Sequence, residues 1–211
     1  MITPDTLRAV DREYRDLVLS LRALASLLHD PDPNAPADPD TAWEPVLANI
    51  LDAELNQLAV LMGDITAALR VESDAPGPLG RVDLARVLSS AVRRTGCRVL
   101  ARVEEPVPVQ AHREIVSQAV ASAISLALRV AGGRVTAAAK RAGKDGAVTV
   151  TIPIGDSPNW SRWDARVGLL RRIVAAEGGK VSMERRGVKA AILTLSFPAA
   201  DLAREHRPAS A

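Results

Sequence analysis

Two long amphipathic segments at the start of the chain constrain the fold more than any other feature. Between Pro4 and His29, apolar residues recur in alternating steps of three and four, at Leu7, Val10, Tyr14, Leu17, Leu21, Leu24 and Leu28. This spacing is a heptad seam, which predicts a helix packed against a partner helix. Thr3, Pro4 and Asp5 suit a helix start, because they supply a cap, a first-turn residue and an acid at the positive end of the dipole.

The second segment repeats the pattern after a loop. The stretch DPDPNAPADPD, between His29 and Thr41, cannot continue a helix because of its prolines. The seam that follows is wide, and it consists of Trp43, Leu47, Leu51, Leu55, Leu58, Met62, Ile65 and Leu69, with Ile50, Leu61 and Ala68 beside them. We predict an antiparallel helical hairpin that dimerises into a four-helix bundle, because one hairpin cannot bury such broad faces alone. The alternative is that the rest of the chain folds back over the spare face.

The composition changes after Arg70. The stretch VESDAPGPLGRVD is rich in proline and glycine, which predicts a linker and a domain boundary. Beyond it, helical and strand periodicities alternate: helices are expected at 83–95, 113–131 and 163–177, and strands at 98–103, 134–140, 147–154, 180–185 and 190–197. Asp83 is expected to cap the first of these helices, and Arg186-Gly187 to turn the last two strands into a hairpin.

This order predicts an α+β chain in which an α/β sandwich, with helices on one face of a mixed sheet, follows the helical hairpin. The expected domains are 1–72 for the hairpin and 80–200 for the sandwich, and residues 201–211 are expected to form a disordered tail.

Composition excludes several functional classes. With 211 residues, of which 47% are hydrophobic, the chain can bury a core, and the 2% of aromatic residues means that aliphatic side chains must fill it. A net charge of +2 is too small to predict nucleic-acid binding. The lone Cys97 rules out an internal disulfide and a cysteine-based metal site. Neither a signal peptide nor a membrane-spanning window is evident, so we expect a cytoplasmic protein that binds no membrane.

The order of elements resembles that of the sensor histidine kinases, in which a dimerisation and histidine-phosphotransfer hairpin precedes an ATP-binding domain of the GHKL type. The resemblance covers nearly the whole chain and rests on spacing more than on identity. The stretches that carry it are VDLARVLSSAV, REIVSQAVASAISLALRV, LLRRIVAAEGGKVSME and the closing GVKAAILTLSFP.

The residues that handle the nucleotide in that family are replaced here. The family's magnesium-binding asparagine matches Leu126, which offers no hard oxygen ligand. The position of the adenine-binding aspartate holds Ile154. Sliding the alignment to Asp156 leaves Ser157 and Pro158 where a flexible backbone is needed.

The phosphate-binding loop is replaced as well. Counted back from Gly178-Gly179, it falls on Asp164, Ala165 and Arg166, whose side chains would block the approach of a phosphate to the backbone. The segment between Asp156 and Trp163 is short for a lid, and the family's closing glycine-threonine step is Lys189-Ala190. We therefore predict that the domain has no working ATP site and binds no cofactor.

Such stripped domains occur in ChpT-like histidine phosphotransferases and in the sporulation phosphotransferase family, which keep the hairpin histidine. The matching run here is Arg15-Asp16-Leu17, in which Arg15 stands at the position of the phosphoacceptor. His29 is a weak substitute because it lies at the end of the first helix. His112 is expected at the surface and His206 in the tail.

One step along the first seam, Arg8, Arg15, Arg22 and His29 fall in register, with Arg12 beside them. The family docks receiver domains on this side of the hairpin, and a receiver's carboxylate pocket could pair with Arg15. The plainer interpretation is a solvated face with an Arg12–Asp16 ion pair.

These observations predict a non-catalytic homodimeric module of two-component signalling, which docks a receiver domain or a histidine kinase through Arg8, Arg12, Arg15, Asp16 and Arg22. The alternative is an active histidine phosphotransferase that relays phosphate through a histidine such as His29. Nucleic-acid binding through the arginines is a third possibility, disfavoured because aromatic stacking residues are scarce.

Overall fold

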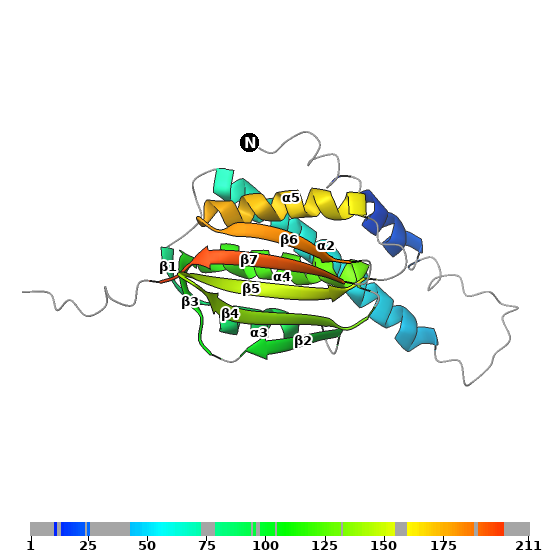
Figure 1. The fold of residues 1–211 in the computed structure, drawn as a ribbon. Helices are drawn as coiled ribbons and strands as arrows, with labels where there is room; N and C mark the ends of the chain where they lie inside the picture. Colours follow the sequence, from blue (N-terminus) through cyan, green and yellow to red (C-terminus); the bar gives the residue numbers. More distant parts are fainter. Residues whose placement is uncertain are drawn as a thin grey trace, which may run out of the picture.

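The computed structural model shows a run of helix near the amino terminus, a long helix, and an α/β unit that follows the long helix in the sequence (Figure 1). The described residues are 11, 14–23, 25, 43–72, 79–93, 95, 98–103, 105–131, 133–154, 160–187 and 190–200. Residues 11, 14–23 and 25 are helical. The elements that follow are α2 (Trp43–Glu72), β1 (Leu79–Asp83), α3 (Leu84–Arg93), β2 (Val99–Val103), β3 (Pro108–His112), α4 (Arg113–Val130), β4 (Val135–Ala142), β5 (Asp145–Pro153), α5 (Trp160–Ala176), β6 (Lys180–Arg186) and β7 (Ala190–Pro198).

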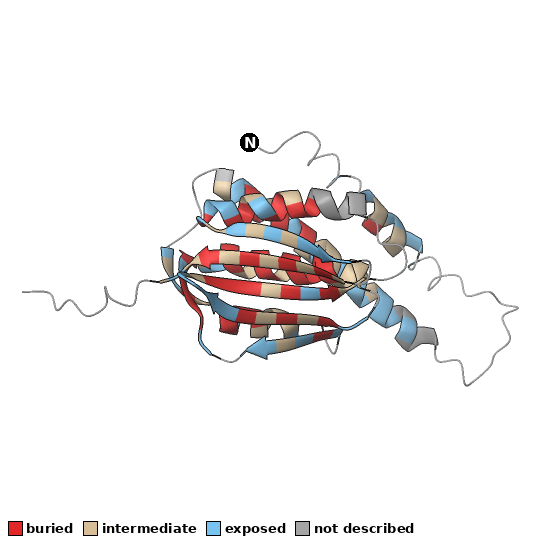
Figure 2. Ribbon diagram, in the orientation of Figure 1, coloured by how far each residue is buried: buried red, intermediate tan, exposed pale blue. Residues whose placement is uncertain are grey.

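The main sheet is mixed, as predicted. Its strands lie in the order β2-β4-β5-β7-β6; β2 and β4 are parallel, and every other neighbouring pair is antiparallel. Burial alternates along the strands (Figure 2), most regularly in β7, where Ala191, Leu193, Leu195 and Phe197 are buried. Helices α3, α4 and α5 pack against the buried face. The core is therefore aliphatic and lies between the sheet and these helices.

A second, two-stranded sheet was not predicted. It pairs β1 with β3 in antiparallel register, from Leu79 opposite His112 to Asp83 opposite Pro108. Strand β1 occupies the end of the stretch that we expected to be a linker. Asp83 does cap α3, because its Oδ1 accepts a hydrogen bond from the backbone N–H of Ala85 at 3.0 Å. The same atom accepts a second from the N–H of Val107 at 3.0 Å, which fastens the segment before β3.

Helix α2 packs on the α/β unit with one of its apolar stripes. It contacts α4 and α5, and Leu61, Ala67 and Ala68 are buried. The two alanines belong to the main core, so the α/β unit covers one face of α2, as in the alternative to the bundle. A different stripe stays exposed and consists of Leu55, Met62 and Leu69. Val46 and Ile50, nearer the start of α2, are exposed as well.

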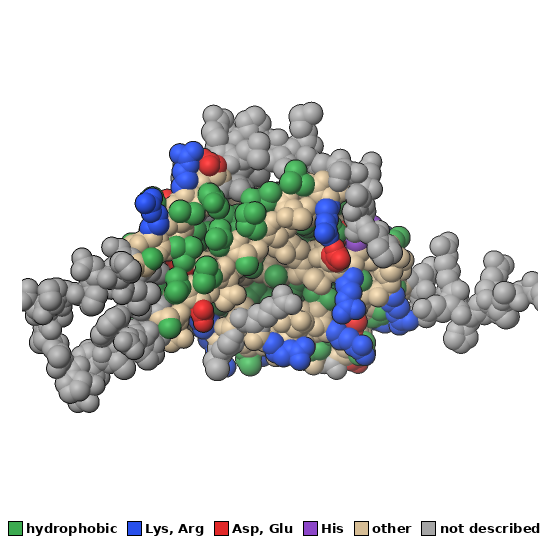
Figure 3. All heavy atoms as spheres, turned by 180° about the vertical axis from the view of Figure 1, so that it is seen from behind, with side chains coloured by type: hydrophobic (Ala, Val, Ile, Leu, Met, Phe, Trp, Pro, Cys, Tyr) green, Lys and Arg blue, Asp and Glu red, His purple; other side chains and the backbone are tan. Residues whose placement is uncertain are grey.

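Figure 3 shows apolar side chains gathered on the rear face of the molecule, over the helices. The hairpin pairing and the dimer remain predictions. No helix in the described part of the chain is long and apolar enough to span a membrane. The expected tail, 201–211, lies outside the described residues, and the domain boundaries also remain predictions.

The double glycine after α5 ends the helix. Gly178 has a φ of +67°, its N–H donates to the Ala175 carbonyl at 3.0 Å, and the N–H of Gly179 donates to the Val174 carbonyl at 3.0 Å. This is a Schellman motif, which needs a left-handed residue at the first glycine. A Cβ on Gly179 would overlap the backbone oxygen of Ser196 in β7. The pair therefore closes the helix and lets the chain pass close to the sheet. The β6–β7 hairpin is confirmed, with Gly187 at a φ of +65°.

Candidate functional site

The positions matching the family's phosphate loop are helical in this protein. Asp164, Ala165 and Arg166 all lie within α5, which begins at Trp160. The Arg166 side chain is buried, whereas the side chains at 160–165 lie outside the described set. Leu126 is buried within α4. The described residues also leave out 155–159, which include Asp156, Ser157 and Pro158, and they leave out Lys189.

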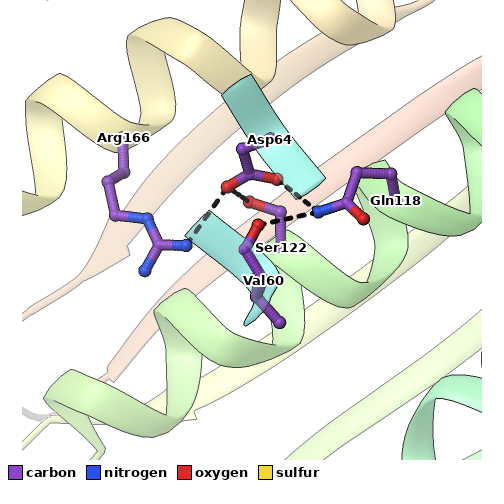
Figure 4. A network of polar contacts seen from close by, with 5 residues as sticks. All are labelled: Val60, Asp64, Gln118, Ser122 and Arg166. Atoms are coloured by element: carbon purple, nitrogen blue, oxygen red, sulfur yellow. Dashed lines mark hydrogen bonds and ion pairs between the residues drawn. The ribbon is translucent and has the colours of Figure 1, made fainter. Parts of the chain in front are cut away.

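Arg166 is joined to α2 and α4 by a buried polar network centred on Asp64 (Figure 4). The guanidinium of Arg166 donates to Asp64 Oδ2 at 3.2 Å, and Ser122 Oγ donates to the same oxygen at 2.8 Å. Gln118 Nε2 donates to Asp64 Oδ1 at 2.7 Å and to the Val60 carbonyl at 3.0 Å. The carboxylate thus connects α2, α4 and α5 at one point.

Burial dominates the electrostatics of this network. The side chains of Asp64 and Arg166 are only 2% and 3% exposed. Loss of solvent raises the pKa of Asp64 above its ordinary value, and the charge of Arg166 and the hydrogen bonds from Gln118 and Ser122 offset part of that effect. Because two charges are held away from water, removing either partner alone leaves the other uncompensated.

Local sequence explains why these groups converge. Gln118 and Ser122 are four residues apart on α4, so they lie on one helix face. Gly63 precedes Asp64, and a Cβ there would overlap the side-chain amide of Gln118. The missing side chain therefore gives Gln118 room to reach Asp64 and the Val60 carbonyl.

Sequence reasoning missed this network, although a signal was present. Asp64 lies three residues after Leu61 and four before Ala68, which places a carboxylate in the middle of an apolar stripe. A charge at such a position needs a buried partner. The sequence pattern instead matched the partner, Arg166, to the phosphate-binding loop of the histidine kinases.

The residues predicted to dock a partner are described only in part. Arg15 is 72% exposed and forms an ion pair with Asp11 at 2.8 Å. Arg22, seven residues further on, is exposed on the same helical face, and Asp16 is half-buried. Arg8, Arg12 and His29 lie outside the described residues, so the suggested Arg12–Asp16 pair is not tested.

A second carboxylate contact was also missed. His112 was expected at the surface, but its side chain is only 17% exposed and its Nδ1 lies 2.9 Å from Oε1 of Glu177. The reason is that β3 leads His112 past the end of α5, where Glu177 is buried. Within the described ranges, no group of three or more His, Cys, Asp or Glu side chains is placed to hold a metal ion. Cys97 lies outside those ranges.

No protein-family model matches the sequence, and no curated protein matches it. Solved structures do match the fold. The histidine kinase AdeS of Acinetobacter baumannii is 15% identical, and the match covers 89% of this chain and 97% of that chain with a TM-score of 0.57. Full-length ShkA, solved in complex with AMPPNP, is 17% identical, with 94% of this chain and 47% of that chain covered and a TM-score of 0.54.

The histidine kinase domain of the Escherichia coli osmosensor EnvZ is 14% identical, with 64% of this chain and 95% of that chain covered and a TM-score of 0.50. At these identities the matches show the fold, which is that of the histidine kinases. The expected resemblance is therefore confirmed at the level of architecture.

Proposed function

We propose that this protein is a non-catalytic, homodimeric interaction module of two-component signalling, which docks a receiver domain or a histidine kinase and does not bind ATP. One observation carries the proposal: Arg166, at the position of the phosphate loop, lies inside a helix and is turned into the protein against Asp64.

That arrangement supports the proposal that 164–166 form no phosphate cradle. A cradle presents free backbone N–H groups to the anion. Because α5 starts at Trp160, the N–H groups of Asp164, Ala165 and Arg166 lie beyond the first turn, within the helix's own hydrogen-bond ladder. The Arg166 side chain is held by Asp64, so it is also removed from any phosphate.

The N-terminal helix supplies the proposed docking surface. Arg15 and Arg22 are exposed on one helical face, and the partner of Arg15, Asp11, is itself 56% exposed. An exposed ion pair of this kind contributes little to stability and is readily exchanged for another carboxylate. A receiver's phosphorylation pocket is a cluster of carboxylates, which suits a guanidinium fork.

The exposed stripe of α2 supports the dimer. Leu55, Met62 and Leu69 recur every seven residues, and they are 47%, 49% and 54% exposed. Exposed apolar side chains at heptad spacing are typical of a helix that packs against another helix. We place the second copy of the chain on this stripe.

The docking proposal is tested by measuring binding between the full chain and the isolated receiver domains of its own genome, each with and without phosphorylation. We expect one receiver to bind, and the Arg15→Glu substitution to weaken that complex by about tenfold or more. Arg171→Glu, at an exposed position on α5, is the matched control and should leave binding unchanged. Absence of any complex, or equal binding by the Arg15 variant, would contradict the proposal.

A further inference from the structure

We infer that His112 and Glu177 form a nucleophilic pair, and that Nε2 of His112 accepts a phosphoryl group from an acyl phosphate. His112 is the last residue of β3 and the N-cap residue of α4. The Glu177 side chain, just beyond α5, is 1% exposed. Its Oε2 accepts the backbone N–H of His112 at 2.8 Å, and its Oε1 lies 2.9 Å from Nδ1 of the same residue.

These two contacts fix the tautomer of the ring. An ionised carboxylate can only accept hydrogen bonds, so Nδ1 must carry the proton that it shares with Glu177. The lone pair of a neutral imidazole then resides on Nε2. A carboxylate held against Nδ1 also fixes the orientation of the ring. The pair therefore presents an oriented nitrogen nucleophile.

The side chain of His112 is 17% exposed, and its Nδ1 lies against Glu177, which is 1% exposed. We therefore assign the accessible edge of the ring to Nε2. In the β1–β3 ladder, Leu79 is opposite His112 and Arg81 is opposite Gln110. Residues two apart on a strand share a face, so Arg81 lies on the outward face with His112. Both Arg81 and Leu79 are exposed.

Nearby charges favour a phosphoryl group over other electrophiles. Arg81 shares the face, Arg113 follows His112 and is exposed, and α4 directs its positive dipole end toward this point. Glu114, in the first turn of α4, opposes these charges among the described residues, and its carboxylate is paired with Arg70. We therefore expect a phosphoryl anion at Nε2 to be favoured by Arg113 and by the N-terminus of α4.

The transfer step needs neither ATP nor an oxidant, because the acyl phosphate supplies both the phosphoryl group and the leaving group. Nε2 attacks phosphorus and an N–P bond forms, while the bond from phosphorus to the acyl oxygen breaks and its electron pair leaves with the carboxylate product. The imidazolium that results keeps its Nδ1 proton, and Glu177 neutralises the positive charge across that hydrogen bond. This inference goes beyond the proposed docking function, because it adds a phosphoryl acceptor to a module that does not itself bind ATP, and it does not depend on Arg15.

The test incubates the full chain with acetyl phosphate and maps acid-labile, base-stable phosphate by mass spectrometry. We expect the label on His112 and its loss in His112→Asn, whose amide can still donate to Glu177. Glu177→Gln should slow labelling about 10- to 100-fold. The controls His29→Asn and His206→Asn should label as the unsubstituted protein does. An unlabelled protein, a label on another residue or unchanged labelling of the Glu177 variant would each overturn the inference.

A second readout does not require any variant to fold. Nitrogen-15 NMR of the histidine-labelled protein should show that the neutral ring of His112 carries its proton on Nδ1. A proton on Nε2 alone would overturn the assignment. Binding of nucleotide and of the unphosphorylated receivers involves no phosphate transfer, so failure of those measurements would be distinguishable from failure at His112.

Discussion

Asp64 and Arg166 are separated by 102 residues in the chain, yet Oδ2 of the first and the guanidinium of the second meet at 3.2 Å in the interior. The pair fixes α2 against α5. Arg166, which the resemblance to the histidine kinases matched to a phosphate loop, is thus part of the joint between the long helix and the α/β unit.

Removing one member of this pair should destabilise the fold strongly. Arg166→Met is expected to lower the free energy of unfolding by about 3–5 kcal/mol, because Asp64 would remain buried without its counter-charge. Arg171→Met, an exposed position on the same helix, should change it by less than about 0.5 kcal/mol. Adding Asp64→Leu to Arg166→Met should recover much of the loss. Urea denaturation measures all four proteins, and a cost near zero for Arg166→Met would show that the pair is unimportant.

The raised pKa of Asp64 predicts a specific dependence on pH. The folded protein binds a proton at this carboxyl more tightly than the unfolded chain does, so protonation of Asp64 adds to the free energy of unfolding at low pH. That contribution is lost as pH rises through the raised pKa. Asp64→Asn removes the titration. The free energy of unfolding of the unsubstituted protein, minus that of the variant, should therefore fall as pH rises from about 4 to about 8. A difference that grows with pH would mean that Arg166 outweighs burial at this site.

Gly63 and Gly168 form a matched pair of helical glycines. A Cβ at Gly63 would overlap the side-chain amide of Gln118, whereas nothing lies within 4 Å of a Cβ at Gly168. Alanine gains about 1 kcal/mol over glycine in a helix, so Gly168→Ala should be neutral or stabilising. The free energy of unfolding of Gly63→Ala should be about 1–3 kcal/mol lower than that of Gly168→Ala, because Gln118 would lose its hydrogen bonds to Asp64 and to the Val60 carbonyl. Equal midpoints in thermal unfolding would rule out this role for Gly63.

The α/β elements could be predicted because each carries its own period of burial, as in the alternating residues of β7. Strands β1 and β3 could not, because β1 follows proline and glycine and each of the two strands is completed only by pairing with the other. The sequence also could not tell which stripe of α2 faces the core. The side of α2 that faces the core is the one with Gly63, Ala67 and Ala68, where small residues let α4 approach.

The exposed stripe of α2, which consists of Leu55, Met62 and Leu69, predicts that the protein associates with itself. Glutamate at both Leu55 and Met62 should convert the proposed dimer into a folded monomer, because charges at a heptad seam would be buried without partners. Leu100→Glu is the control, at an exposed leucine on β2 away from that stripe. Sedimentation velocity reports the masses directly. A monomeric unsubstituted protein, or a dimer that survives both changes, would place no partner copy on α2.

The most direct test of the central claim is calorimetric titration of the full chain with ATP in the presence of Mg²⁺. We propose that the helical, inward-facing Arg166 leaves no phosphate cradle at 164–166, so we expect no saturable binding up to about 1 mM nucleotide, the upper end of ordinary enzyme affinities. Saturable binding with a dissociation constant in the micromolar range would contradict the claim, and would mean that the fold has kept a nucleotide site.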